Sequence, residues 1–345
     1  MKSKTQKLIL GNHGSYLGME KGCFVVKDKH GKVERYPVFE KEIGEVILKS
    51  GNAVSTGALA SMGFWGIDVV ILTQKGNPVA VLKNIDDDSH VKTRIAQYEA
   101  LKNGRGIDIA KQITESRIES QNVILRKHGL EQHDLMKAKK KIKSINNENL
   151  KTVRKKLIPI EGIATEFYFK QIFQLFPESL RIEKRKTFKA YDGINNTLNL
   201  AYTILKYKVH SAILKAHLEP FLGFIHSEQF GKPSLVCDFQ ELYRYLIDDF
   251  LVEFSQSLKK KDFRIKWKHF SSNRKGKREI LDHEKTKQLT ESLNQYFQSK
   301  VEIPRIRHGK RQTIETLINE EAYLFAKYLR NEKDSWKPRI PTLNN

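Results

Sequence analysis

Three separated segments of the chain place an acidic or imidazole side chain where chemistry could occur. Glu161 follows Pro159 and is predicted near the start of a helix, while His226 ends a short apolar segment. Asp238 and Glu241 lie three residues apart on a predicted helix, so their side chains are expected to project together along one edge of it. Two carboxylates and an imidazole from separate segments suit a divalent ion that stays partly hydrated and open to phosphate oxygens.

Each of these side chains also has a purely structural interpretation. Glu161 could interact with a helix dipole, His226 could be a hydrogen-bonded core histidine, and Asp238 could cap a helix. Spacing alone leaves both interpretations open.

The elements that must position these residues divide the chain into a β-rich part and a helical part. Short apolar or alternating runs predict strands at residues 7–10, 23–26, 33–38, 46–48, 69–72 and 79–82, with one small helix at about 56–62. Apolar residues then recur at helical spacing, beginning with Val91, Ile95, Tyr98 and Leu101. We therefore predict an α+β multidomain protein with a small N-terminal β-rich domain, residues 1–85, and a large all-α catalytic domain, residues 86–345.

An acidic triplet, Asp86, Asp87 and Asp88, marks the predicted boundary. Three adjacent carboxylates on a short linker point in divergent directions, which suits a metal ion poorly. Negative charge is favourable at the start of a helix. We therefore predict that the triplet caps the first helix of the second domain.

The charge of the chain predicts a polyanionic partner. Lysine and arginine number 62 against 40 acidic residues, a formal net charge of +22. Residues 259–278 alone contain ten basic residues and one acid, interleaved with Phe263, Trp267 and Phe270. Such a stretch is either a solvated loop or a surface that follows a nucleic-acid backbone and stacks rings on bases. For the whole chain, nucleic acid is favoured over a membrane, because no basic helix with a broad apolar face accompanies the charge.

Several classes of protein are disfavoured by composition. The two cysteines, Cys23 and Cys237, cannot form a disulfide framework or a cysteine-rich zinc module. No apolar run approaches the length of a membrane span, and the N-terminal residues lack the apolar core of a signal peptide. We expect a cytoplasmic protein with no membrane partner.

Six blocks of sequence, taken in order, carry a family resemblance. They are Gly51-Asn52-Ala53-Val54-Ser55, Gly66-Ile67-Asp68-Val69, Glu161-Gly162-Ile163-Ala164, Asp192-Gly193-Ile194-Asn195, Gly223-Phe224-Ile225-His226 and Ser234-Leu235-Val236-Cys237-Asp238. In this order they resemble the CRISPR-associated endonuclease and integrase family called "Cas one", over nearly the whole chain. The chain departs from the family pattern at Ala201, where glycine is usual, and at Gly193, where proline is common.

The resemblance implies a catalytic metal site formed by Glu161, His226 and Glu241, with Asp238 as a nearby acid and Mg²⁺ or Mn²⁺ as the metal. It also implies a homodimer assembled through the β domains. The implied substrate is DNA that is double-stranded, branched or has single-stranded ends. The implied partner is the small "Cas two" protein, with which the enzyme inserts new spacers into a CRISPR array.

Contacts to DNA are predicted from side-chain type alone, for Arg185, Arg244, Lys259, Lys260, Lys261 and Trp267. Tyr168 and Ser234 could position a phosphate or simply pack. Two other functions remain open at this point: the integrase of a mobile element that shares the fold, and a catalytically silent nucleic-acid-binding scaffold.

Overall fold

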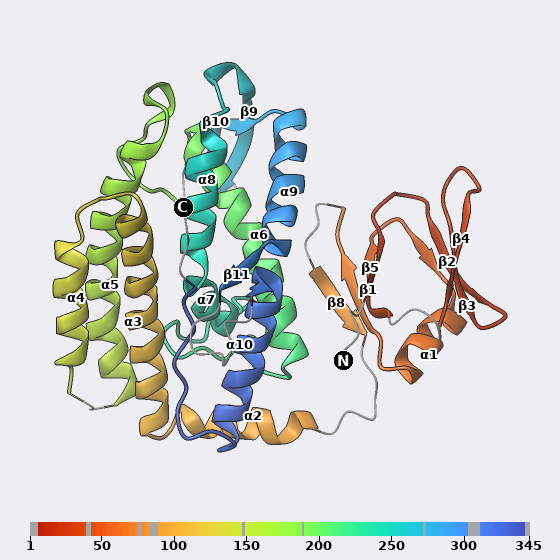
Figure 1. Ribbon diagram of the computed structural model, residues 1–345, viewed down its shortest axis with the longest axis horizontal. Coiled ribbons are helices and arrows are strands. Elements are labelled where there is room, and N and C mark those ends of the chain that lie inside the picture. Colours follow the sequence, from red (N-terminus) through yellow and green to blue (C-terminus); the bar gives the residue numbers. More distant parts are fainter. Residues whose placement is uncertain are drawn as a thin grey trace. The chain divides into compact units, whose positions relative to one another are not determined.

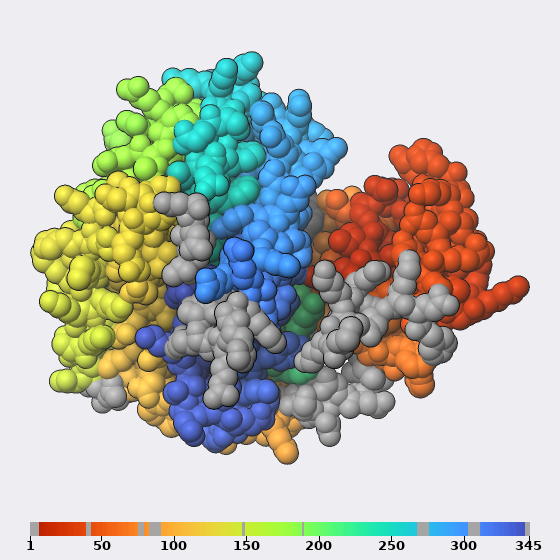
Figure 2. Space-filling view, in the orientation of Figure 1, coloured from red at the N-terminus to blue at the C-terminus, as the bar shows by residue number. Residues whose placement is uncertain are grey.

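The computed structural model describes residues 6–38, 43–74, 78–82, 89–146, 149–187, 190–271, 274–302 and 311–341. The chain divides into two compact units, Met1–Ser89 and His90–Asn345. The sequence placed this boundary between residues 85 and 86, and the acidic triplet at 86–88 lies outside the described residues. Each unit is described separately below (Figures 1 and 2).

The N-terminal unit contains two four-stranded sheets and one helix. Its elements are β1 (Gln6–Leu10), β2 (Tyr16–Glu20), β3 (Cys23–Lys27), β4 (Val33–Pro37), β5 (Ile43–Lys49), β6 (Ala53–Val54), α1 (Thr56–Phe64), β7 (Asp68–Leu72) and β8 (Pro78–Leu82). One sheet has the order β1-β5-β7-β8 and the other β4-β3-β2-β6. Leu17, Phe24, Val46 and Val69 are fully buried, so side chains from both sheets form one core.

The predicted strands and the small helix of this unit are present, but two strands were missed. In β2, Gly18 interrupts the strand, and glycine is a poor strand former because it contributes no side chain to pack. β6 has only two residues, too few to show a pattern. The prediction of β strands followed by a helical region is nevertheless confirmed.

The second unit is mostly helical. Its elements include α2 (Ser89–Ala100), α3 (Gly104–Lys127), α4 (His133–Lys143), α5 (Leu150–Ile172), α6 (Gly193–Lys215), α7 (Ser234–Glu241), α8 (Arg244–Ser255), α9 (His283–Gln298) and α10 (Ile314–Leu329). Short 3-10 helices span Phe173–Leu175, Glu178–Leu180 and Lys260–Asp262. Helices α3, α4 and α5 pack side by side, and their yellow to yellow-green surface forms one side of the unit in Figure 2. The short helix α7 contacts both α3 and α6, so it lies inside the unit.

The expectation that this domain is entirely helical is wrong. β9 (Phe263–Ser271) pairs antiparallel with β10 (Arg274–Leu281), and β11 (Lys300–Glu302) pairs with β12 (Arg311–Thr313). The sequence of β9 alternates Phe263, Ile265 and Trp267 with basic residues. Alternation with a period of two is a strand signal, although the sequence pattern was interpreted above as a solvated loop or a nucleic-acid surface and not as a strand.

Helix α5 also differs from its predicted form. It begins at Leu150, where Asn149 accepts a hydrogen bond from the Thr152 amide as the N-cap, and Pro159 lies inside the helix. Glu161 is therefore in the middle of a helix, where a helix-terminal dipole cannot account for it.

Candidate active site

Asp238 on α7 organises the segment that carries His226. Its carboxylate accepts hydrogen bonds from the amides of Phe224, Ile225 and His226, at 2.5, 2.9 and 3.0 Å. The same carboxylate lies 2.7 Å from Nδ1 of His226. Because Nδ1 faces Asp238, Nε2 is the ring nitrogen that remains for a ligand.

The close approach of this segment to α7 explains the glycine at position 223. A Cβ atom there would lie 2.8 Å from the carbonyl oxygen of His226 and 2.9 Å from Oδ2 of Asp238. Ser234, at the start of α7, donates its hydroxyl hydrogen to the carbonyl of Ser227 and so also holds the loop. The block Gly223-Phe224-Ile225-His226 and helix α7 therefore form one structural unit.

Asp238 and Glu241 do not point at the same target, although they lie three residues apart. Asp238 is fully buried against the His226 segment. Glu241, at the end of α7, forms ion pairs with Arg117 and with Arg244, whose Nη1 lies 2.6 Å from Oε1. Asp238 therefore orients the His226 ring, whereas Glu241 faces the positively charged side chains of Arg117 and Arg244.

Arg117 on α3 joins the two glutamates that the sequence singled out. Its Nε atom lies 2.5 Å from Oε1 of Glu161, and its Nη1 atom contacts Oε2 of Glu241. Thr165, one turn after Glu161 on α5, donates its hydroxyl hydrogen to the same carboxylate at 3.0 Å. Helices α3, α5 and α7 thus bring both carboxylates to one guanidinium.

Arg117 was not among the residues predicted from the sequence, although a signal was present. Ile113, Arg117, Ser120 and Ile124 follow helical spacing on α3, and all four are buried. An arginine in the core register of a helix requires an anionic partner in the interior. The partners, Glu161 and Glu241, lie on other helices and far along the chain.

Charge outweighs burial at Glu161. Burial acts to raise the pKa of the Glu161 carboxyl, but the Arg117 charge, the Thr165 hydrogen bond and the charges of Arg244 and His226 lower it overall. Burial lowers the pKa of Arg117, although the charge of Glu161 acts in the opposite direction.

The residues present suit a divalent cation, even though they are not assembled around one. Within the described part of the chain, no three His, Cys, Asp or Glu side chains form a ready cluster of ligands. Glu161 and Glu241 nevertheless share one cation, the Arg117 guanidinium, and the His226 ring is oriented by the Asp238 carboxylate. This donor set, two carboxylates and an imidazole, fits Mg²⁺ or Mn²⁺ by ligand type.

The predicted DNA-contacting arginines lie beside this group. Arg244 and Arg185 approach the ring of Tyr202, with their guanidinium carbons 4.3 and 5.3 Å from its centroid. Arg185 also donates hydrogen bonds to the side-chain oxygens of Asn195 and Asn199. These contacts hold both arginines in place around Tyr202.

Tyr168 has an internal role. Its hydroxyl donates to Oδ2 of Asp248 at 2.9 Å, and the Tyr202 hydroxyl hydrogen-bonds to the other oxygen, Oδ1. Burial raises the pKa of Asp248, while the two tyrosine hydrogen bonds act in the opposite direction. Tyr168 is fully buried, so it packs beneath the site rather than facing a phosphate.

Where it is described, the basic stretch at residues 259–278 forms a 3-10 turn and most of the β9–β10 hairpin. Trp267 on β9 is 64% exposed, and Nζ of Lys277 on β10 lies 5.6 Å from its ring centroid. The Phe263 ring packs so closely on Gly193 that a Cβ there would lie 2.3 Å away. The Glu279 amide donates a hydrogen bond to the carbonyl oxygen of Tyr191. This bond also attaches the hairpin of β9 and β10 to the start of α6.

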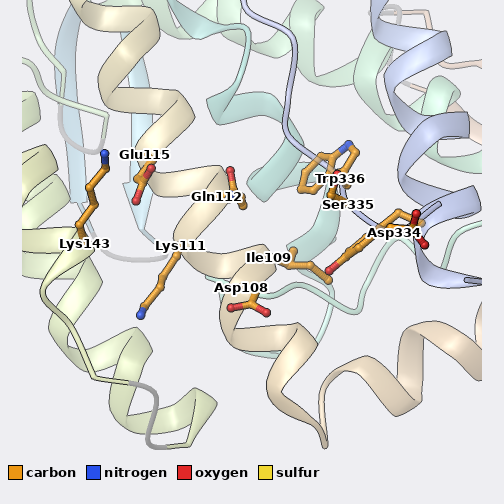
Figure 3. A pocket seen from close by; sticks show the side chains of 10 residues that line it. Asp108, Ile109, Lys111, Gln112, Glu115, Lys143, Asp334, Ser335 and Trp336 are labelled. Carbon is orange, nitrogen blue, oxygen red and sulfur yellow. The ribbon is translucent and has the colours of Figure 1, made fainter.

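A separate cavity of about 380 Å³ contains none of the predicted site residues (Figure 3). Acidic and basic side chains both line it, among them Asp108, Lys111, Glu115 and Lys143. Such a mixed lining is poorly suited to a polyanion.

Comparison with known proteins places this chain in a family. The model of the family described as CRISPR associated protein Cas1 matches residues 8–286. A CRISPR-associated endonuclease Cas1 of Archaeoglobus fulgidus is 31% identical over 267 residues, 71% of this chain and 76% of the relative. Another from Pyrobaculum aerophilum is 31% identical over 248 residues, 70% of this chain and 80% of the relative.

Solved structures show the same fold. The casposase bound to integration product aligns with a TM-score of 0.69 at 20% identity, covering 99% of this chain and 100% of that one. A chain of the partial Cas6-RT-Cas1–Cas2 complex aligns with a TM-score of 0.70 at 21% identity, covering 97% and 99%. The sequence relatives are named endonucleases, so the chain is of the nuclease class. The chain belongs to the CRISPR-associated Cas1 family, and the family resemblance of the six sequence blocks is confirmed.

Proposed function

We propose that this protein is a metal-dependent DNA endonuclease and integrase of CRISPR adaptation, which captures foreign DNA and inserts it as spacers. The observations that carry the proposal are the convergence of Glu161 and Glu241 on the Arg117 guanidinium and the orientation of the His226 ring by Asp238, on the same helix as Glu241. The names of the sequence relatives, CRISPR-associated endonucleases, support the same activity.

Glu161, His226 and Glu241 are the residues that would hold Mg²⁺ or Mn²⁺. A metal held there would supply Lewis-acid chemistry, polarising the scissile phosphate and stabilising charge on the departing oxygen. Asp238 keeps Nδ1 of His226 occupied and so directs Nε2 toward the site. The nucleophile is a DNA 3′-hydroxyl during integration and water during hydrolysis.

DNA is the proposed substrate, and the exposed basic hairpin is its proposed backbone contact. Lys259, Lys260 and Lys261 are exposed just before β9, and Trp267 is an exposed ring among basic residues. The casposase to which this chain is similar is bound to an integration product. DNA with branches or single-stranded ends offers both phosphates for the lysines and free bases for the ring.

Replacing Lys259, Lys260 and Lys261 with Gln should weaken DNA binding equally for all sequences. Each lost phosphate contact lowers the slope of log K against log salt by about 0.9, so three contacts give roughly two to three units. Trp267→Ala should instead weaken binding to single-stranded ends by about 1–3 kcal/mol with an unchanged slope, because stacking releases no ions. Anisotropy titrations at several salt concentrations measure both effects. Unchanged slopes and unchanged end-binding would mean that the hairpin only confers solubility.

The proposed assembly is a homodimer formed through the β domains, together with the small Cas2 protein. One of the similar structures is a complex that contains both Cas1 and Cas2. In the described part of the chain, no helix is long and apolar enough to cross a membrane. Because the proposed substrate is the CRISPR array, we place the protein in the cytoplasm.

Deleting residues 1–85 should produce a monomer that binds DNA poorly. The two units have separate cores, so the helical unit should remain folded when the deletion removes the proposed dimer contact. Sedimentation velocity measures the mass, and circular dichroism checks the fold. A truncated protein that still sediments as a dimer would place the interface in the helical unit.

An integrase of a mobile element is the second candidate, since the casposase shares the fold. Integration assays with plasmids that carry or lack a CRISPR array separate the two functions. Insertion confined to the array supports adaptation, whereas equal insertion into both plasmids supports a mobile-element enzyme. A catalytically silent scaffold would insert into neither.

A further inference from the structure

The Arg117 guanidinium occupies the gap between the two proposed ligand carboxylates. The Arg117 side chain is only 7% exposed, and it contacts Glu161 through Nε and Glu241 through Nη1. Within the described residues, the guanidinium also donates to the neutral Thr165 hydroxyl, which lies 3.4 Å from Nε and 3.3 Å from Nη2. The two carboxylates therefore provide the contacts that compensate a buried positive charge.

A divalent cation would compete for these same two carboxylates. Glu161 is 29% exposed and Glu241 13%, so bulk water screens their charges only in part. An oxygen that ligates a metal directly cannot keep a short contact to a guanidinium nitrogen on the same lone pair. Arg117 takes Oε2 of Glu241 while Arg244 takes Oε1, so both oxygens of this carboxylate already face a guanidinium. A metal that binds Oε2 of Glu241 and Oε1 of Glu161 must therefore displace Arg117 from them.

We propose that Arg117 is a resident counter-cation, which holds Glu161 and Glu241 together in a metal-free state and must release them when the metal binds. This inference rests on the proposed metal site. Loading a divalent cation changes the group of Arg117, Glu161 and Glu241 from net negative to net positive. The guanidinium that has left the carboxylates can then attract and hydrogen-bond an incoming phosphodiester, which is the anion that the substrate supplies.

The metal affinity of an Arg117→Gln variant tests this exchange. Glutamine fills part of the space and carries no charge, so it competes for the carboxylates only as a neutral donor. Mn²⁺ should then bind about tenfold more tightly than to the wild type, within the usual range of site-to-site coupling. Electron paramagnetic resonance of free Mn²⁺ measures the affinity without any DNA or turnover. Equal or weaker binding in Arg117→Gln would overturn the exchange and make Arg117 a support for the ligands.

Arg339→Gln is the matched control. Arg339 is also a buried arginine paired with a buried glutamate, since its Nε lies 2.8 Å from Oε2 of Glu321. Both variants should unfold at lower temperature without metal. Mn²⁺ should raise the melting temperature of Arg117→Gln more than that of the wild type, and should give Arg339→Gln no such extra gain. Equal gains in both variants would contradict the exchange.

A crystal structure of the Mn²⁺-loaded wild type keeps the proposal testable even if Arg117→Gln does not fold. The exchange predicts that the guanidinium has left at least one of the two carboxylates. A guanidinium still bound to both Glu161 and Glu241 beside a bound metal would overturn it. If neither the wild type nor Arg117→Gln binds Mn²⁺, both the metal site and the exchange fail, whereas weaker binding by Arg117→Gln alone removes only the exchange.

Discussion

Glu161→Gln, His226→Ala and Glu241→Gln should each reduce DNA cleavage and integration by at least about a hundredfold. Loss even of a group that only orients a metal ligand typically costs 10–100-fold, and loss of a ligand should cost at least as much. The three effects should not add, because the ligands act as a unit. Single-turnover assays with Mg²⁺ and with Mn²⁺ measure the losses.

A loss of activity in His226→Ala is the easiest of the three to interpret, because this substitution leaves both glutamates paired with Arg117. Each glutamate substitution removes one of the two carboxylates that compensate the buried Arg117 charge. The double variant Glu161→Ala/Glu241→Ala removes both, and an uncompensated buried charge costs about 3–5 kcal/mol of stability. Its inactivity could therefore reflect unfolding, and melting curves must accompany the assay.

Glu166→Gln is the matched control for Glu161→Gln. Glu166 lies on the same helix, is exposed, and pairs at 3.5 Å with Lys184 on the surface. Its loss should change stability little, because exposed ion pairs contribute about 0–1 kcal/mol. Near-normal activity in any of the three site variants, with Glu166→Gln also active, would refute the ligand assignment.

Asp238→Ala should have the largest effect on stability of any single substitution at the site. The carboxylate is fully buried and accepts three backbone hydrogen bonds, and each buried amide left unsatisfied costs about 1–3 kcal/mol. Asp238→Asn keeps one oxygen and should be less damaging. Urea denaturation of both variants measures the free energy of unfolding.

The same two variants should also bind metal about 10–100-fold more weakly, because His226 loses the partner that orients its ring. Asp249→Asn is the control, since Asp249 is a buried carboxylate whose Oδ1 lies 3.1 Å from Nε2 of His128. It should lose stability without losing metal affinity. Unchanged Mn²⁺ binding in Asp238→Asn would show that the Asp238 carboxylate does not act through His226.

Most of the fold could be predicted because its signals are local. The strands containing Val46 and Val69 are short apolar runs between turns, and helix α6 repeats apolar residues at helical spacing from Leu198 to Ala212. β9 was missed although its alternation is equally local, because basic residues fill its polar positions and resemble a solvated loop. The start of α5 was misplaced because Pro159 is more common in a first turn than inside a helix.

The site was harder to predict because its contacts link distant parts of the chain. Residue types and motif order selected Glu161, His226, Asp238 and Glu241, but they could not show which carboxylate faces which partner. The different partners of Asp238 and Glu241 are set by the three backbone amides that surround Asp238 and by Arg117, which contacts Glu241 from another helix. Buried charge pairing of this kind is set by tertiary packing and leaves only a weak sequence signal.

Single-turnover cleavage of branched DNA, with chelator and then with excess Mn²⁺, tests the metal-dependent active site most directly. The wild type should lose all cleavage in the chelator and regain it with Mn²⁺, while His226→Ala should remain inactive in both conditions. Cleavage by the wild type that persists in the chelator, or cleavage by His226→Ala that matches the wild type in Mn²⁺, would contradict a catalytic metal held by Glu161, His226 and Glu241.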